Sequence, residues 1–326
     1  MFKSFTLHGI AGVLAVVCLS AFAGTASAQG QLYFTDLFNP DFETGSIKRV
    51  NTDGTGLTQL VNTGGGVRGL AVDQIGGKMY WADVNQSMIR RANLDGSGQE
   101  DLLQLFGSGE DFPFPSAITL HQQGGKMYWG DQVLGTMNRA NLDGSGFEVL
   151  FATPFHRGVA VDSVNGKLYW STSLDTFKGE IMRSNLDGSN PEVVVTSLDE
   201  RFKPNKISLD ILAGKIYWTD YTADIVRRSN LDGSGIETLY VPPFNRNPQG
   251  ISLDLQGGKI YWGQDIQIEG HDGKIMSMNF DGSGAQDFML GFGHVAEVVY
   301  VPVPEPLTLT IMAGGLAALI ARRRVR

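Results

Sequence analysis

The chain repeats one short pattern six times, and this repeat restricts the possible folds more than any other feature of the sequence. Each copy contains an aromatic pair, Tyr-Phe in the first copy and Tyr-Trp in the other five, whose tyrosines are Tyr33, Tyr80, Tyr128, Tyr169, Tyr217 and Tyr261. Successive tyrosines are 47, 48, 41, 48 and 44 residues apart. A turn of the form Asn-x-Asp-Gly follows every pair and begins at Asn51, Asn93, Asn141, Asn185, Asn230 and Asn279. A period of this length indicates one supersecondary unit that is copied along the chain.

Each unit reads as four short strands. In the second copy, residues 67–73, 78–83, 87–94 and 100–105 carry apolar, aromatic or alternating side chains, and glycine-containing turns separate them. The Asp95-Gly96 pair is typical of a tight hairpin turn, because glycine accepts a positive φ. Six such units of four antiparallel strands predict an all-β fold, a six-bladed β-propeller.

The two ends of the repeat array complement each other. The first copy starts at residues 32–36, which correspond to the second strand of a unit, so its first strand is missing. After the sixth hairpin turn and a strand near residues 286–290, one strand-like segment is left over at residues 295–301. We expect this C-terminal strand to close the first blade, because the ring then has no free sheet edge.

Residues 1–28 predict a secretory signal peptide, and residues 29–301 the propeller domain. The leader contains Lys3, an apolar run over residues 13–19, and the small-residue pattern Ala26-Ser27-Ala28. An uncleaved anchor is the alternative, but the run is shorter than the ~20 residues that a membrane span needs. Cys18, the only cysteine, lies in this leader, so the exported domain has no disulfide, thiol nucleophile or cysteine metal ligand.

Residues 302–326 have the composition of a sorting signal. Pro302, Pro304 and Pro306 predict an extended spacer, residues 307–321 are apolar apart from two threonines, and four arginines follow. We expect a short hydrophobic helix that inserts transiently into a membrane, with the arginines on the cytoplasmic side. A plain C-terminal anchor is the alternative, although such an anchor would usually be longer.

The charge of the domain argues against nucleic acid as a partner. Removing the leader and the tail takes away five of the 26 lysine and arginine residues and one of the 34 aspartate and glutamate residues, which leaves a net charge of about −12. Such an acidic surface repels phosphate backbones.

The repeat resembles the Tyr-Trp-Thr-Asp (YWTD) repeat of low-density lipoprotein receptor class B propellers. Residues 214–220 followed by residues 229–234 match that pattern in full, and the resemblance extends over nearly all of residues 31–301. It implies the six-bladed fold but no particular receptor ligand. Three copies depart from the pattern, at Phe34, at Ser171-Thr172 and at Gly263-Gln264.

The tail resembles the PEP-CTERM sorting signal of Gram-negative bacteria. The resemblance rests on Pro304, Glu305 and Pro306, the apolar segment and the arginine end, in that order. It implies an exosortase-type processing enzyme as a partner, cleavage near the proline-glutamate-proline motif, and release or attachment at the bacterial cell surface or in the extracellular matrix.

The conspicuous repeated residues predict structure rather than chemistry. Aromatic pairs that recur in every copy are expected to pack sheet upon sheet. Asp36, Asp83, Asp131 and Asp220 are expected to bond nearby backbone. The Asn-x-Asp-Gly turns lack the further oxygen ligands and the fixed closing glutamate of a calcium loop, so we expect turns and no metal site there.

No catalytic motif is present, and the four histidines of the domain, His121, His156, His271 and His294, fall in different strands or blades. The inner strands begin with Arg68, Ser116, Arg157, Lys206 and Gln249. This cationic and neutral ring disfavours the carboxylate cage of the metal-dependent lactonases that share the six-bladed fold. No cofactor is expected, and the spacing leaves open a structural ion in the channel.

Connection lengths distinguish the two rims of the predicted ring. The first-to-second and third-to-fourth connections are short and nearly identical, and they share one rim, which we call the turn rim. The other connections are long and irregular and share the opposite rim, the loop rim. Loops on a rigid scaffold commonly carry function. The candidate binding residues at the loop rim are Arg68, Arg157, Lys206 and Gln249 as hydrogen-bond donors, with Phe38, Phe112 and Tyr221 as apolar contacts.

These observations predict an exported, non-enzymatic propeller that binds an extracellular protein or glycan through its loop rim. A hydrolase or lyase of the lactonase type, acting at the channel mouth, is the first alternative. A structural matrix component without a discrete ligand is the second.

Overall fold

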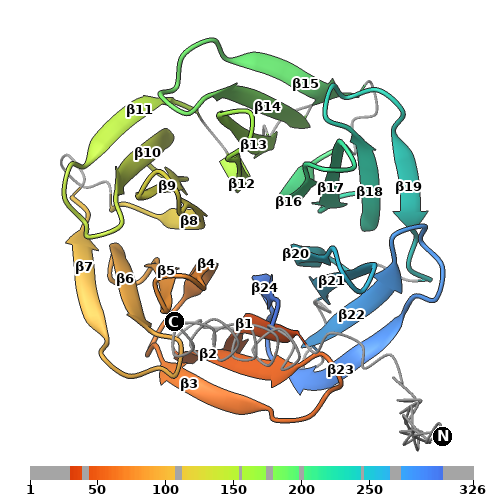
Figure 1. The fold of residues 1–326 in the computed structure, drawn as a ribbon, viewed down its shortest axis with the longest axis horizontal. Coiled ribbons are helices and arrows are strands. Elements are labelled where there is room, and N and C mark those ends of the chain that lie inside the picture. The colour runs from red at the N-terminus through yellow and green to blue at the C-terminus, as the bar shows by residue number, and fades with distance from the viewer. Residues whose placement is uncertain are drawn as a thin grey trace, which may run out of the picture.

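The computed structural model describes residues 30–38, 44–106, 112–153, 156–173, 179–197, 202–243, 246–264 and 273–303. Within these ranges, six four-stranded antiparallel sheets stand around a central axis like the blades of a propeller (Figure 1). The predicted all-β, six-bladed fold is therefore confirmed. The leader, the sorting motif Pro304-Glu305-Pro306 and the predicted hydrophobic helix lie outside the described residues.

Each blade begins at the central channel and ends at the periphery. Blade 1 comprises β24 (Val298–Val301), β1 (Gln31–Phe38), β2 (Thr44–Asn51) and β3 (Thr58–Asn62). Blade 2 comprises β4 (Val67–Asp73), β5 (Lys78–Asp83), β6 (Met88–Asn93) and β7 (Glu100–Gln104). Blade 3 comprises β8 (Pro115–His121), β9 (Lys126–Asp131), β10 (Thr136–Asn141) and β11 (Glu148–Ala152). Blade 4 comprises β12 (His156–Asp162), β13 (Lys167–Ser173), β14 (Gly179–Asn185) and β15 (Glu192–Thr196). Blade 5 comprises β16 (Pro204–Asp210), β17 (Lys215–Asp220), β18 (Ile225–Asn230) and β19 (Glu237–Tyr240). Blade 6 comprises β20 (Pro248–Asp254), β21 (Lys259–Gln264), β22 (Gly273–Asn279) and β23 (Gln286–Phe292).

The repeated aromatic pair builds the core between the blades. Neighbouring residues of a strand point to opposite faces of the sheet, so the tyrosine and the tryptophan of one blade enter two different interfaces. Each hydrophobic cluster accordingly joins the tyrosine of one blade to the tryptophan, or to Phe34, of the next: Tyr33 and Trp81, Tyr80 and Trp129, Tyr128 and Trp170, Tyr169 and Trp218, Tyr217 and Trp262, and Tyr261 and Phe34. All twelve rings are at most 5% exposed, which confirms their predicted packing role.

Polar contacts reinforce the same interfaces at the turn rim. Arg91 of β6 pairs with Glu100 of its own blade and donates to the carbonyl of Leu142, 2.9 Å away, in the hairpin turn of the next blade. The same arrangement recurs with Arg139 and Leu186, Arg183 and Leu231, and Arg228 and Phe280. In these four blades the acidic residue after the hairpin turn thus serves as the partner of this arginine, whereas in blade 6 Asp287 pairs with Lys274.

The hairpin turns are held by hydrogen bonds among their own residues, as the turn prediction requires. In blade 2, the hydroxyl and the backbone N–H of Ser97 both donate to Asp95 Oδ1, at 2.6 and 2.9 Å. The amide of Asn93 donates to Ser97 and its oxygen accepts from Lys78, while Gly96 takes a φ of 86°. The Asp95 carboxylate therefore accepts its hydrogen bonds from serine and backbone donors within the turn.

The repeated aspartates after the aromatic pair bond backbone, as predicted. Asp83 accepts from the N–H of Gln86, and Asp220 accepts from that of Ala223. Burial raises the pKa of both carboxyl groups. Arginines on the next strand lie within 3.8 Å and offset that effect, Arg90 for Asp83 and Arg227 for Asp220.

The departures from the repeat have local causes. Blades 4 and 6 replace the aspartate by Thr172 and Gln264, and the cation opposite the tryptophan is replaced there by Met182 and Met276. The two members of the ion pair are therefore lost together. Gly263 has a different cause, because a Cβ atom at this position would lie 2.2 Å from the carbonyl oxygen of Val295.

The C-terminal strand closes blade 1. β24 pairs antiparallel with β1, and Val298 lies opposite Phe34. The paired segment covers 298–301 rather than the predicted 295–301, because Glu297 instead exchanges hydrogen bonds with the backbone and hydroxyl of Thr35. Val295 and Ala296 are nevertheless fully buried, so the whole segment contributes to the core.

No helix among the described residues is long and apolar enough to cross a bilayer.

Removing residues 294–301 should unfold the domain cooperatively. Val295, Val298 and Val301 are at most 6% exposed, and burial of a valine contributes about 1.5–3 kcal/mol, so the loss is comparable with the 5–15 kcal/mol that stabilises a whole domain. The measurement is thermal unfolding followed by circular dichroism. A deletion of residues 303–326 is the matched control and should leave the midpoint unchanged. Equal midpoints for both deletions would show that β24 is dispensable.

Candidate functional site

The six inner strands surround the channel, and a ring of side chains lines its mouth at the loop rim. In β4, β8, β12, β16 and β20 the register with the second strand shifts near the start of the strand. Such irregularities redirect side chains. The mouth is lined by Arg68, Ser116, Arg157, Asn205 and Gln249, with Ala296 from the segment before β24, Gln132 from blade 3, and Lys206 at its floor.

This arrangement corrects the predicted ring at one position. The sequence interpretation placed Lys206 beside Arg68 and Arg157, but Asn205 occupies that place in blade 5. The strand ends give the alignment, because Asp210 pairs with Lys215 in the way that Asp73 pairs with Lys78. Lys206 therefore lies one residue further along the strand.

Two arginines dominate the loop-rim mouth. Arg68 lies over the ring of Phe114, 5.4 Å from its centroid, and Arg157 lies over Tyr221 at 5.3 Å. Burial, together with the positive charge of Arg157, lowers the pKa of Arg68. Two like charges at one mouth, in a domain of net negative charge, suit an anionic group.

The space at this mouth is small. The hollow between the arginines and Gln249 has a volume of about 20 Å³, little more than one water molecule needs. An occupant therefore contacts the mouth from outside, and only a group as small as a carboxylate or hydroxyl can enter it.

The other predicted site residues fall into three situations. Phe112 is 80% exposed just ahead of β8. Tyr221 is half-buried beneath Arg157, and Gln249 accepts a hydrogen bond from the amide of Asn205. Phe38 ends β1, but its side chain lies outside the described part of the structure.

Lys206 closes the channel below the mouth. Its ammonium donates to Glu297 Oε2 at 2.8 Å, to the Arg68 carbonyl at 2.9 Å and to the Ser116 carbonyl at 3.2 Å. These three bonds use all three ammonium hydrogens and connect blade 5 to blades 1, 2 and 3. Lys206 is thus engaged within the protein, in contrast to the donor role predicted for it.

Glu297 was missed by the sequence interpretation, although it is the partner of Lys206. The corresponding positions of the other four blades hold small residues, Gly69, Ala117, Gly158 and Gly250. Added Cβ atoms would clash there, 2.6 Å from the Asn205 oxygen at Gly158 and 2.4 Å from Glu297 Cα at Gly250. Four small residues let the inner strands approach, and the remaining two side chains fill the centre.

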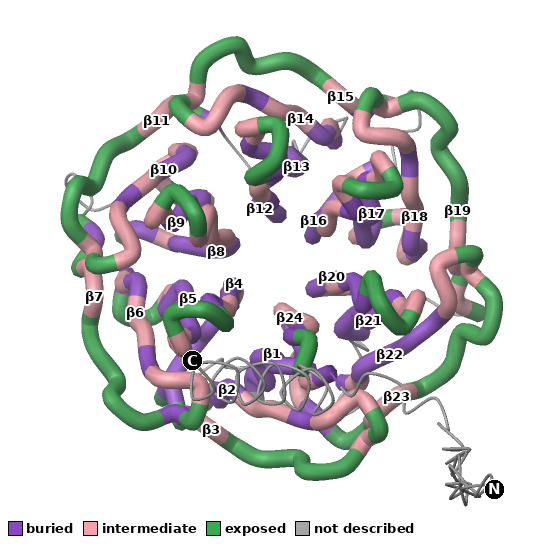
Figure 2. The backbone as a smooth tube through the Cα atoms, in the orientation of Figure 1, coloured by how far each residue is buried: buried purple, intermediate pink, exposed green. Residues whose placement is uncertain are grey.

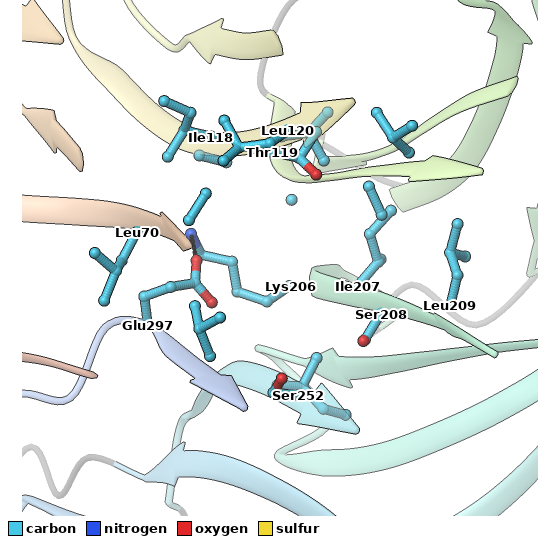
Figure 3. A pocket seen from close by; sticks show the side chains of 18 of the residues that line it. Leu70, Ile118, Thr119, Leu120, Lys206, Ile207, Ser208, Leu209, Ser252 and Glu297 are labelled. Atoms are coloured by element: carbon cyan, nitrogen blue, oxygen red, sulfur yellow. Dashed lines mark hydrogen bonds and ion pairs between the residues drawn. The ribbon is translucent and has the colours of Figure 1, made fainter. Parts of the chain in front are cut away.

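A larger cavity of about 290 Å³ lies on the other side of this ion pair and extends toward the turn rim. Its walls are aliphatic side chains and the edges of the inner strands, including Leu120, Leu209 and Ser252, and Lys206 and Glu297 lie together at its floor (Figure 3). The ion pair therefore separates a shallow cationic mouth from a deeper cavity whose walls are both polar and aliphatic.

The arrangement nearest to a catalytic pair is Ser116 and His156. Ser116 Oγ lies 3.3 Å from His156 Nε2, and His156 Nδ1 lies 3.2 Å from the carbonyl of Thr153. Burial lowers the pKa of His156, so the ring is neutral at pH 7. The two residues are only 2% and 0% exposed, and the imidazole fills the space that Gly130 leaves open. The geometry is that of packing between blades.

No cluster of three or more histidine, cysteine, aspartate or glutamate side chains that could hold a metal ion occurs in the described ranges.

The fold and the repeat define the class of the protein as a six-bladed β-propeller built from YWTD-type repeats. Proteins related to the low-density lipoprotein receptor share stretches of its sequence. A low-density lipoprotein receptor-related protein 1 from Pyricularia oryzae is 40% identical over 87 residues, which cover 26% of this chain and 28% of that protein. The human low-density lipoprotein receptor-related protein 5-like protein is 32% identical over 166 residues, which cover 50% of this chain and 62% of that protein.

A further relative and two solved structures complete the comparison. Protein cueball from Drosophila erecta is 30% identical over 209 residues, covering 62% of this chain and 25% of that protein. A chain of the nidogen/laminin complex superposes with a TM-score of 0.68 at 20% identity, covering 84% of this chain and 98% of that one. TolB from Acinetobacter baumannii superposes with a TM-score of 0.65 at 13% identity, covering 84% of this chain and 67% of that one. These structures support the fold alone.

No family model matches the chain. The matches span between a quarter and 62% of the curated relatives.

Replacing Lys206 by methionine should destabilise the domain in a pH-dependent way. The side chains of the pair are 9% and 12% exposed, and breaking a buried pair by removing one partner costs about 3–5 kcal/mol. Burial already raises the pKa of Glu297 above 4.5 while Lys206 opposes the rise, so Lys206→Met should raise that pKa further. A carboxyl group whose pKa is raised in the native state contributes most to the free energy of unfolding at pH values below its unfolded-state pKa. It loses that contribution as the pH increases through its native pKa.

Urea unfolding at pH 5 and pH 8 measures this effect, and the loss should be larger at pH 8. The double variant Lys206→Met/Glu297→Gln is the control, since it removes the charge whose burial creates the pH dependence. A single variant that matches the wild type at both pH values would contradict a stabilising role for the pair.

Proposed function

We propose that this protein is an exported, non-enzymatic propeller that binds an extracellular protein or glycan at the loop-rim mouth of its channel. The observation that carries the proposal is the pair of arginines, Arg68 and Arg157, held at this mouth by aromatic rings. Their guanidinium groups suit a carboxylate, and the Gln249 amide suits a carboxylate or hydroxyl. The bound group is therefore an acidic side chain of a protein or an acidic sugar.

The surroundings of the mouth support recognition of a large partner. The hollow accepts only a small group, so most of the contact must come from the rim around it. Phe112 offers an exposed aromatic surface on that rim, and aromatic side chains are enriched where binding energy concentrates. The solved nidogen/laminin complex contains a propeller of similar fold within a protein–protein complex, which adds support by analogy.

The hydrolase or lyase alternative has weaker support. It requires a nucleophile or base that a substrate can reach, and the Ser116–His156 pair is almost completely buried. A purely structural matrix role does not by itself call for two arginines at a mouth where the equivalent positions of the other blades are uncharged.

The proposal includes export and processing of the tail. The leader pattern of residues 1–28 supports export, and the order of Pro304-Glu305-Pro306, apolar segment and arginines supports recognition by an exosortase-type enzyme. The tail would insert transiently into the membrane before cleavage, and the propeller would then reside at the outer surface of the bacterial cell or in the surrounding matrix.

Replacing both arginines by glutamine should weaken ligand binding and leave folding intact. A screen of residues 29–301 against acidic and neutral glycans and secreted proteins supplies the ligand, and titration calorimetry measures its affinity. Charge-assisted hydrogen bonds contribute about 1.5–3 kcal/mol each, so Arg68→Gln/Arg157→Gln should weaken binding at least tenfold. The melting temperature should change little.

The control variant is Lys78→Gln/Lys215→Gln, which removes the same charge from the turn rim. It should bind like the wild type. Equal weakening in both variants would show a non-specific effect of net charge. If the arginine variant unfolds but its folded fraction binds with unchanged affinity, the arginines serve to stabilise the contact between blades rather than to bind a ligand.

Surface-localised protein from the producing organism should lack residues 322–326. Cleavage near the Pro304-Glu305-Pro306 motif removes the arginine end, and intact-mass spectrometry detects the loss. A variant with all three motif residues replaced by alanine should retain the arginines. Their presence on the wild-type surface form would show that the tail is a plain anchor.

A further inference from the structure

The turn rim carries exposed aliphatic side chains that none of the interactions described so far uses. The side chains of Ile75, Val164, Leu212 and Leu255 are 87%, 74%, 94% and 50% exposed. Each lies in the turn between the first and second strand of its blade, and these turns appear as exposed segments around the channel (Figure 2). We call these four residues the aliphatic crown.

The four turns reach to similar heights. In each blade the aspartate that ends the first strand pairs with the lysine that begins the second, as Asp73 with Lys78 and Asp210 with Lys215. The turns between these pairs have equal length, and the exposed residue is the second of the turn at Ile75, Val164 and Leu212 and the first at Leu255. Apolar side chains on equivalent turns of one rim are suited to an extended surface rather than to a pocketed one.

The apolar surface continues inward from the crown. Ile211, next to Leu212, lines the 290 Å³ cavity together with Val72 and Val161. Isolated exposed aliphatic residues are common on proteins, but several around one opening indicate an interaction surface.

The chain leaves the propeller at this same rim. β24 ends at Val301, opposite Gln31, and the carbonyl of Pro302 accepts a hydrogen bond from the amide of Gln74, the neighbour of Ile75. Four residues, 303–306, then separate the rim from the apolar segment 307–321. A proline-rich spacer extends by about 3.1 Å per residue, so the apolar segment begins within about 12 Å of the crown.

We propose that the turn rim is the membrane-facing surface of the protein and that the aliphatic crown contacts zwitterionic lipid while residues 307–321 are inserted in the bilayer. This inference rests on the membrane insertion included in the proposed function. The short spacer does not let the propeller move far from the bilayer, and the exit point determines which rim faces it. The arginine mouth then points away from the membrane, toward extracellular partners.

Charge selects the kind of lipid. The hairpin turns lie on the same rim, since the Leu94 N–H donates to the Gly77 carbonyl and Lys78 donates to Asn93. Hydrogen bonds from serine hydroxyl and backbone groups lower the pKa of five turn aspartates, Asp95, Asp143, Asp187, Asp232 and Asp281, which keeps them ionised. Lysines that begin the second strands, Lys78 and Lys215 among them, lie on this rim too, so the rim presents both signs of charge, which suits a zwitterionic surface.

The test uses single-cysteine variants of the chain from residue 29 to 326, which contains no natural cysteine. Leu212→Cys reports on the crown and Phe112→Cys on the loop rim, and both native side chains are at least 80% exposed. Each variant is labelled with an environment-sensitive fluorophore and reconstituted into phosphatidylcholine vesicles that contain nitroxide-labelled lipid. Flotation of the vesicles measures insertion of the tail independently.

The label at Leu212→Cys should shift to shorter wavelength and be quenched at least threefold more than the label at Phe112→Cys. The background substitution Ile75→Ser/Leu255→Ser should reduce the quenching at Leu212→Cys, while leaving flotation and melting temperature unchanged.

Other outcomes overturn the inference in distinguishable ways. Flotation without preferential quenching at Leu212→Cys leaves tail insertion intact and rejects the membrane-facing crown. Failure to float rejects the insertion itself and the inference with it. A spectral shift without vesicles that disappears when residues 303–326 are removed shows that the tail covers the crown. A spectral shift that needs no vesicles and increases with protein concentration shows that a second copy of the protein covers the crown.

Discussion

The contact between the tyrosine of one blade and the tryptophan of the next holds the ring together. A twisted four-stranded sheet cannot bury either of its faces alone, and adjacent residues of a strand point to opposite faces. An aromatic dipeptide in the second strand therefore supplies one large ring to each of two interfaces. Because Tyr261 of the last blade meets Phe34 of the first, every interface depends on its neighbours. This mutual dependence requires the strand missing from blade 1, and β24 supplies it from the other end of the chain.

Ring closure also determines what the channel can do. Small residues such as Gly69 and Gly158 let the inner strands approach closely, and a Cβ atom at either would clash with the next strand. Lys206 and Glu297 occupy the space that remains and bond one another, so the channel is closed at this layer. A buried ion pair contributes little net stability compared with apolar packing. Its effect here is spatial, because it separates the mouth that is lined by two arginines from the 290 Å³ cavity on the turn-rim side.

Much of the fold followed from the sequence because its determinants are local and repeated. The period, the hairpin turns and the unmatched strand could each be recognised from the spacing of residues. The site was harder to predict. The sequence interpretation placed Lys206 at the mouth, whereas alignment on the aspartate that ends the strand, Asp210 in this blade, places Asn205 there. Glu297 carries no repeat signature, and its register follows only from the pairing of β24 with β1. The side chain of Phe38 and most of the irregular loops lie outside the described residues.

Functional information in this protein lies in the departures from the repeat. A residue present in every blade answers a need that every blade has, such as the packing of Tyr80 or the turn bonds of Asp95. Gly130 differs because His156 needs its space, which is again a structural cause. Arg68 and Arg157 pack on aromatic rings, yet the equivalent positions of the other blades hold no cation, and turn geometry does not require the aliphatic tips of the turn rim. The scaffold determines where these side chains are held, and their identities are free to suit what the protein meets on each side: a partner at the mouth and, by our inference, a membrane at the crown.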